Sequence, residues 1–312
     1  MQLDYNILWI DDDLSYYIER GAIENLKEYI YSDLGFMPNV VTITEAAGFE
    51  IDQDESKYDL IISDYNLGDD SNTGVQVVEK IREHCLTEIL FYTGNISADI
   101  EATLRTALIN IDRITIHIGR DSLIEKIQEL IQLSVQKLLE LNATRGLITA
   151  LTSELDVDIK EITLYLIRKK LDKKQEDLDW IINQYVDDFL KKGPDRFNAK
   201  YQEIGFDSLF HSIESNRKWR IFRNLMKEYG KQDTDQIITD FLYANKTYFE
   251  QVIDIRNKFA HAKEEEKDGR LVLMGQYGKE DFEFDNEKCI EIRKNLIQHK
   301  KNFEELIEYF KI

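Results

Sequence analysis

Three aspartates lie where two buried strands are expected to end. Asp11 and Asp12 follow the apolar run YNILWI (5–10), and Asp64 follows YDLIIS (58–63). In an open parallel sheet, the carboxyl ends of the strands meet at one edge, where ligands bind. Clustered carboxylates repel one another, so we expect Mg²⁺ beside Asp11, Asp12 and Asp64. A carboxylate next to Mg²⁺ can attack a phosphoryl group, because the cation neutralises the developing charge.

The elements that would position these residues alternate between strand and helix. Apolar, β-branched or aromatic runs at 5–10, 39–44, 58–63, 88–93 and 113–118 are separated by helical patterns at about 14–34, 45–53, 72–84 and 98–109. Short, nearly continuous apolar runs are typical of buried parallel strands. The alternation predicts an α/β domain with one parallel sheet. Thr93 ends the fourth run, where its hydroxyl could bind a phosphoryl oxygen.

The segments ILWIDDD, DLIISDYNLG and ILFYTG, in this order, resemble the receiver domain of two-component response regulators. The resemblance covers about residues 1–135 and implies a flavodoxin-like five-stranded parallel sheet in a domain at 1–138. It implies that Asp64 is the phosphoacceptor and that Asp11 and Asp12 bind Mg²⁺. Asn66 would offer its backbone carbonyl to the metal, and Thr93 would be the switch residue. A histidine kinase or another phosphodonor is the implied partner in a phosphorelay.

The fifth strand departs from the receiver pattern. Receivers usually carry a Lys there, which pairs with the phosphoryl group, but RITIHIGRDSL contains none. Ile116, His117 or Ile118 occupies the corresponding place. His117 or Arg120 is a candidate substitute, although a planar guanidinium is not equivalent to an ammonium group.

A second set of polar residues ends a long helical pattern in YFEQVIDIRNKFAHAKEEE. Arg256 and His261 are separated by about 140° around a helix, so two copies facing each other across a two-fold axis would be needed to build one cleft. A neutral His can exchange a proton with a ribose 2′-hydroxyl or a leaving oxygen. An Arg can stabilise charge on the phosphorus. This combination suits RNA cleavage without a metal.

The sequence IRNKFAHA within a helical segment resembles the HEPN superfamily, whose signature is an Arg followed by four to six residues and then a His. The resemblance covers about residues 145–312. It implies a mostly α-helical bundle, a homodimer and a metal-independent endoribonuclease of toxin or anti-phage type. Arg256 and His261 would be catalytic, with Asn257 supporting them. The alternatives are a surface Arg with a His that caps the helix C-terminus, and an inactive binding module.

The second half of the chain is expected to be helical at about 147–170, 173–191, 206–228, 232–262 and 286–310, with a charged turn at 264–270 and a small β-hairpin at 271–284. A basic cluster offers Arg217, Lys218, Arg220 and Arg223 as candidate RNA contacts. The interleaved aromatic residues Trp219 and Phe222 could stack on bases, but individually we assign both to the core. His299 lies in a polar helical setting and is expected to be exposed.

Charge and composition exclude several classes. The net charge is −20, of which −17 falls in residues 1–140 (10 basic, 27 acidic) and −3 in residues 141–312 (30 basic, 33 acidic). Such a chain repels nucleic acid at long range, and no helix-turn-helix pattern supports sequence-specific DNA binding. No membrane span or signal peptide is recognisable. Cys85 and Cys289 lie far apart, which fits a reducing cytoplasm.

Together these observations predict a signal-gated response regulator with a HEPN-like endoribonuclease as its output domain. The alternative is a non-catalytic phospho-signalling adaptor, whose helical domain binds a partner protein.

Overall fold

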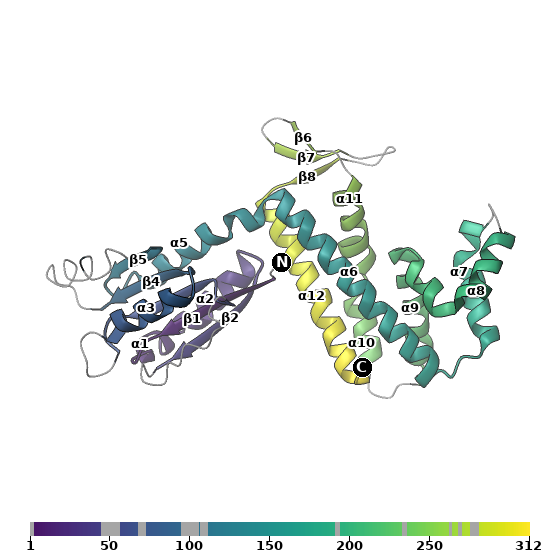
Figure 1. Cartoon of the computed structure of the whole chain (residues 1–312), viewed down its shortest axis with the longest axis horizontal. Helices are drawn as coiled ribbons and strands as arrows, with labels where there is room; N and C mark the ends of the chain where they lie inside the picture. Colours follow the sequence, from purple (N-terminus) through teal and green to yellow (C-terminus); the bar gives the residue numbers. More distant parts are fainter. Residues whose placement is uncertain are drawn as a thin grey trace. The chain divides into compact units, whose positions relative to one another are not determined.

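The computed structural model describes residues 3–44, 57–67, 73–94, 106, 112–190, 194–232, 236–261, 264–267, 270–274 and 281–312 (Figure 1). The chain divides into two compact units, residues 2–140 with 289–294 and residues 141–288 with 295–312. We call them the N-terminal unit and the helical unit. The helices expected at 45–53 and 98–109 lie outside the described residues, apart from Thr106.

The N-terminal unit contains a five-stranded sheet of order β2-β1-β3-β4-β5. All neighbouring strands are parallel. The strands are β1 (Asp4–Ile10), β2 (Met37–Ile43), β3 (Leu60–Asp64), β4 (Glu88–Thr93) and β5 (Ile114–Ile118). The five predicted strands are therefore confirmed. β3 and β4 are buried almost throughout, as continuous apolar runs predict.

Helices α1 (Ser15–Ile18), α2 (Ala22–Ser32), α3 (Thr73–His84) and α5 (Leu123–Val135) accompany the sheet. The single helix expected at 14–34 is wrong, because the chain breaks at Gly21. This residue has φ 64°, in the left-handed region that glycine enters at little cost.

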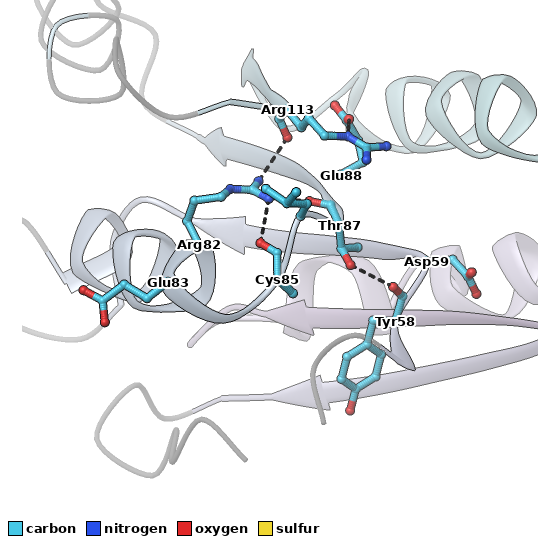
Figure 2. Close-up of a pocket in the computed structure, with 9 residues that line it drawn as sticks. Tyr58, Asp59, Arg82, Glu83, Cys85, Thr87, Glu88 and Arg113 are labelled. Atoms are coloured by element: carbon cyan, nitrogen blue, oxygen red, sulfur yellow. Dashed lines mark hydrogen bonds and ion pairs between the residues drawn. The ribbon is translucent and has the colours of Figure 1, made fainter. Parts of the chain in front are cut away.

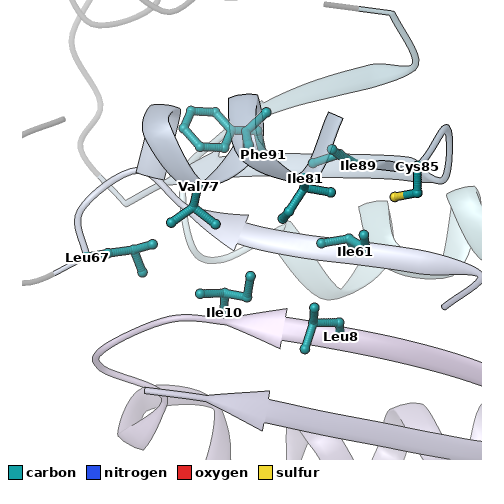
Figure 3. Packing of buried hydrophobic residues seen from close by; sticks show 10 residues of the cluster. Leu8, Ile10, Ile61, Leu67, Val77, Ile81, Cys85, Ile89 and Phe91 are labelled. Carbon is teal, nitrogen blue, oxygen red and sulfur yellow. The ribbon is translucent and has the colours of Figure 1, made fainter. Parts of the chain in front are cut away.

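Each face of the sheet carries its own helices. On one face, Val77 and Ile81 of α3 join Ile10 and Ile61 in a buried apolar cluster (Figure 3). On the other, Trp9 packs against Tyr17 of α1 with ring centroids 5.1 Å apart. Tyr5 on that face shares a hydrogen bond of 2.7 Å with Ser134 of α5. Alternate residues of β1 thus bind opposite helices, as the two-residue strand period requires.

The N-terminal unit contains the 3-10 turn η3 (Gln136–Leu139) near residue 140. The helical unit starts at Leu141. Its elements are α6 (Leu141–Tyr165), the π-helix η4 (Leu166–Lys170), α7 (Gln175–Leu190), α8 (Pro194–Ser212), α9 (Ser215–Tyr229), α10 (Ile237–Ala244), the π-helix η5 (Phe249–Asp254), α11 (Ile255–His261) and α12 (Asn286–Phe310). The helix expected at 232–262 is divided, because the chain turns between α10 and η5.

Aromatic side chains pack against one another in the core of the helical unit. Phe222 of α9 stacks on Phe303 of α12 at 5.7 Å between centroids, and Trp219 lies 4.3 Å from Tyr248. Trp219 and Phe222 are buried, which confirms their assignment to the core. Both are then inaccessible to nucleic-acid bases.

A small antiparallel sheet of order β6-β7-β8 follows α11 (Figure 1). Its strands are β6 (Glu264–Lys267), β7 (Arg270–Leu273) and β8 (Phe282–Phe284). The expected hairpin is present as β7 and β8. A charged turn is expected at 264–270. This prediction is wrong for residues 264–267, which form β6 and pair with β7. No helix in the described part of the chain combines the length and the apolarity that a membrane span requires.

Candidate functional site

The carboxyl ends of β1 and β3 bring the three predicted aspartates together. These strands are neighbours, with Ile10 paired to Ser63, so Asp11 and Asp64 emerge side by side. Single carboxylate oxygens of Asp11, Asp12 and Asp64 all lie within 4.8 Å of one another. Asp11 and Asp64 are buried, whereas Asp12 is exposed. We call this group the acidic site.

Burial makes the acidic site costly to ionise fully. Removal from water raises the pKa of Asp64 to about 7, and the neighbouring charge of Asp11 adds to the rise. Burial likewise raises the pKa of Asp11. One oxygen of Asp64 accepts a hydrogen bond of 2.8 Å from the backbone N–H of Tyr65, which partly opposes the rise.

The donor set fits a hard divalent cation. Mg²⁺ and Ca²⁺ prefer oxygen ligands, and three carboxylate oxygens within this span can contact one ion. A bound cation would also supply the positive charge that two buried carboxylates need. Asn66 lies two residues beyond β3 with its side chain exposed.

The end of β4 contributes Tyr92 and Thr93 to the acidic site. Tyr92 pairs with Asp64 in the sheet, and Thr93 is the next residue, fully buried at the strand end. The Tyr92 hydroxyl donates a hydrogen bond to Asp11 and accepts one of 3.3 Å from the Trp9 indole N–H. The sequence analysis missed Tyr92. The signal available was a tyrosine in a buried strand, whose hydroxyl needs a polar partner.

The end of β5 carries no Lys, and its two candidate substitutes are placed differently. His117 is half-buried in the strand, and its Nε2 lies 3.3 Å from Ser122 Oγ. Arg120 follows the strand, with Nη1 3.8 Å from Asp13 Oδ2. Burial raises the pKa of both Asp11 and Asp64, and the charge of Arg120 opposes that rise slightly.

A hollow of about 720 Å³ lies at the opposite end of β3 and β4 (Figure 2). The Arg82 guanidinium donates to the backbone carbonyls of Cys85 and Thr87 at 3.0 Å and of Arg113 at 3.3 Å. Arg82 therefore joins the turns that precede β4 and β5. These contacts give it a structural role.

In the helical unit, Arg256 and Asn257 lie half-buried at the start of α11. Within the described part of the chain, the Arg256 Nε is buried without a hydrogen-bond partner. The charge of Arg256 acts on Tyr248, whose pKa burial raises far above its usual value. The His261 side chain lies outside the described residues. The pairing of Arg256 with His261 therefore stays a prediction.

The candidate RNA contacts on α9 do not share one environment. Lys218 is buried, with Nζ 3.7 Å from Asp156 Oδ2, so its inclusion among surface contacts is wrong. Arg217 and Arg223 are half-buried, and Arg220 is exposed. The Nε of Arg217 lies 3.8 Å from Oε2 of Glu214.

His299 is 1% exposed, so its expected exposure is wrong. Its Nδ1 lies 2.7 Å from Asn245 Oδ1 and its Nε2 2.9 Å from Gln251 Oε1. Burial lowers the pKa of His299 to about 4, so the ring is neutral at pH 7 and carries one N–H. The network is satisfied if Gln251 turns its NH₂ toward Nε2.

No protein-family model matches the chain, and no curated protein matches it. Among solved structures, it is similar to a response regulator receiver domain protein from Methanospirillum hungatei (19% identity, 43% of this chain and 98% of the other, TM-score 0.32). Others are a response regulator from Thermotoga maritima (19%, 41% and 98%, 0.29) and an adenylate cyclase from Rhodopirellula baltica (21%, 43% and 94%, 0.29).

Proposed function

We propose that the N-terminal unit is a phosphoryl-accepting receiver and that Asp64 is its acceptor. The observation that carries this proposal is a buried carboxylate at the end of β3, with carboxylate oxygens of Asp11 and Asp12 within 4.8 Å. A cluster of this kind is costly to bury without a cation, and buried carboxyl groups with raised pKa values are typical of functional sites.

In the proposed reaction, an ionised oxygen of Asp64 attacks the phosphorus of the phosphoryl group carried by a histidine kinase or another phosphodonor. The bond between phosphorus and the donor atom breaks, the donor keeps the electron pair, and an acyl phosphate forms. Bound Mg²⁺ would neutralise phosphoryl charge. Asp11, Asp12 and the Asn66 carbonyl would hold the ion, while the Thr93 hydroxyl would bind a phosphoryl oxygen.

The test is incubation of the purified full chain with acetyl phosphate and Mg²⁺, followed by intact mass spectrometry. We expect a mass gain of one phosphoryl group in the wild type and none in Asp64→Asn. Asp4→Asn is the matched control, because Asp4 is exposed at the far end of β1. An equal mass gain in Asp64→Asn would refute the assignment.

We further propose that the helical unit is the output domain and acts as a metal-independent, dimeric HEPN-type endoribonuclease. Its support is the motif formed by Arg256, Asn257 and His261, all three of which belong to α11. A guanidinium that is only half-buried, as that of Arg256 is, can still bind a phosphodiester. Phosphorylation of Asp64 would gate the activity.

RNA cleavage by the full chain tests this second proposal, with and without acetyl phosphate. Arg256→Ala and His261→Ala should abolish cleavage, whereas the control Lys258→Ala should retain it. Lys258 lies on the same helix and pairs with Asp254 at 3.0 Å. Undiminished cleavage by both motif variants would refute the nuclease. Absence of cleavage by the wild type in either state would favour the non-catalytic adaptor.

A further inference from the structure

Arg120 is the cation that the described structure places at the acidic site. It follows β5 by two residues, and the Gly119 N–H before it donates 2.9 Å to the Thr93 carbonyl. This bond fixes the turn that carries Arg120 to the end of β4. The backbone of Arg120 is therefore held close to the residues that would receive a phosphoryl group.

Gly94 supplies the space through which the Arg120 side chain runs. A Cβ atom placed on Gly94 would lie 2.6 Å from Arg120 Nε and 3.1 Å from its Cγ. These distances are shorter than van der Waals contact, so a side chain at position 94 would push Arg120 aside. Because Gly94 directly follows Thr93, Arg120 crosses the backbone at the mouth of the acidic site.

The present partners of Arg120 bind it weakly. Nη1 is 3.8 Å from Asp13 Oδ2, and both side chains are more than one-third exposed. The guanidinium carbon lies 5.6 Å from the centre of the Tyr16 ring. An exposed ion pair at this distance contributes little to stability, so a stronger anion nearby would displace it.

His117 is a poorer candidate for the same role. Its ring lies within the strand, half-buried and next to Ser122. Burial lowers its pKa below the usual value, which favours the neutral ring at pH 7. A neutral imidazole supplies no net charge against a phosphoryl dianion.

We propose that Arg120 binds the phosphoryl group on Asp64, in place of the absent lysine, by exchanging Asp13 for the phosphoryl oxygens. This inference rests on the proposed receiver function. A phosphoryl group carries a charge of about −2 and accepts two parallel N–H bonds from a guanidinium. Loss of the Asp13 pair would then alter the surface around α1, where Tyr16 also binds Asp121 at 2.9 Å.

The experiment compares phosphorylation by acetyl phosphate and Mg²⁺ in the wild type and in variants at Arg120, His117 and Gly94, using intact mass spectrometry of the full chain. Loss of a charge-assisted hydrogen-bonded pair predicts that Arg120→Gln lowers the extent of phosphorylation roughly tenfold. Arg120→Lys should restore most of it. His117→Gln should stay within about twofold of wild type, because the Ser122 contact is local.

Gly94→Ala provides the second measurement, since it displaces the guanidinium without removing its charge. It should lower phosphorylation in the wild-type background and have no further effect in Arg120→Gln, because the two changes act through one side chain. Equal phosphorylation of Arg120→Gln and wild type, or a tenfold loss in His117→Gln, would overturn the inference alone. Absence of any Asp64-dependent phosphorylation of the wild type would overturn the receiver function and this inference together.

Discussion

The raised pKa of Asp64 makes the stability of the N-terminal unit depend on pH in an unusual direction. The pKa rises from 3.8 in the unfolded reference to about 7 in the folded chain, because of burial and the charge of Asp11. Between these values the folded state holds the proton more tightly than the unfolded state. Raising the pH therefore favours unfolding.

The magnitude follows from the shift. About 3 pKa units correspond to roughly 4 kcal/mol over the whole titration, at 1.36 kcal/mol per unit. The part that falls between pH 5 and pH 8 is roughly 2 to 3 kcal/mol. In the presence of a chelator, we expect the unfolding free energy of the wild type to fall by that amount over this range, relative to Asp64→Asn.

The assay is hydrogen exchange pulse labelling in increasing urea, read on peptides from β1 and β3. These peptides report the N-terminal unit separately from the helical unit. Comparison of wild type with Asp64→Asn removes the contribution of other titrating groups. Millimolar Mg²⁺ should abolish the difference in slope, since a bound cation favours the ionised carboxylate. Parallel pH profiles for the two proteins without Mg²⁺ would refute the reasoning.

Three further outcomes are expected. Tyr92→Phe leaves Asp11 and the Trp9 indole without their shared partner and should destabilise the N-terminal unit by about 1 to 3 kcal/mol in the same urea assay. Gly74→Ala should cost at least about 2 kcal/mol, because its Cβ would lie 2.3 Å from the Asp64 carbonyl oxygen; an unchanged midpoint would contradict this. The lowered pKa of His299, about 4 against 6.5, leaves stability intact above pH 6.5 and removes about 3 kcal/mol as the pH falls toward 4. Exchange in α12 peptides should show that loss in the wild type and not in His299→Gln.

The sequence predicted the strands and the acidic site because both depend on local patterns. Continuous apolar runs define buried parallel strands, and the sheet edge brings together residues that end adjacent strands. Asp11 and Asp64 needed no further information to be placed side by side. The break of the first helix at Gly21 needed more, because many glycines are tolerated inside helices at modest cost.

The side chains missed by sequence reasoning depend on contacts between distant segments. His299 occupies a polar helical sequence, yet its hydrogen-bond partners Asn245 and Gln251 come from elements about fifty residues earlier. Lys218 similarly belongs to a basic sequence cluster but pairs with Asp156 on another helix. Local charge and periodicity do not specify such partners, since they arise only when the helices pack.

The hydrogen-bonded series from the Trp9 indole through the Tyr92 hydroxyl to Asp11 provides a natural optical reporter. Trp9 is fully buried, and a single hydroxyl separates it from a carboxylate of the acidic site. Cation binding or phosphorylation that changes the charge on Asp11 would alter the polarity around this indole and hence its fluorescence. Trp180 and Trp219 lie in the helical unit and supply a reference emission within the same label-free chain.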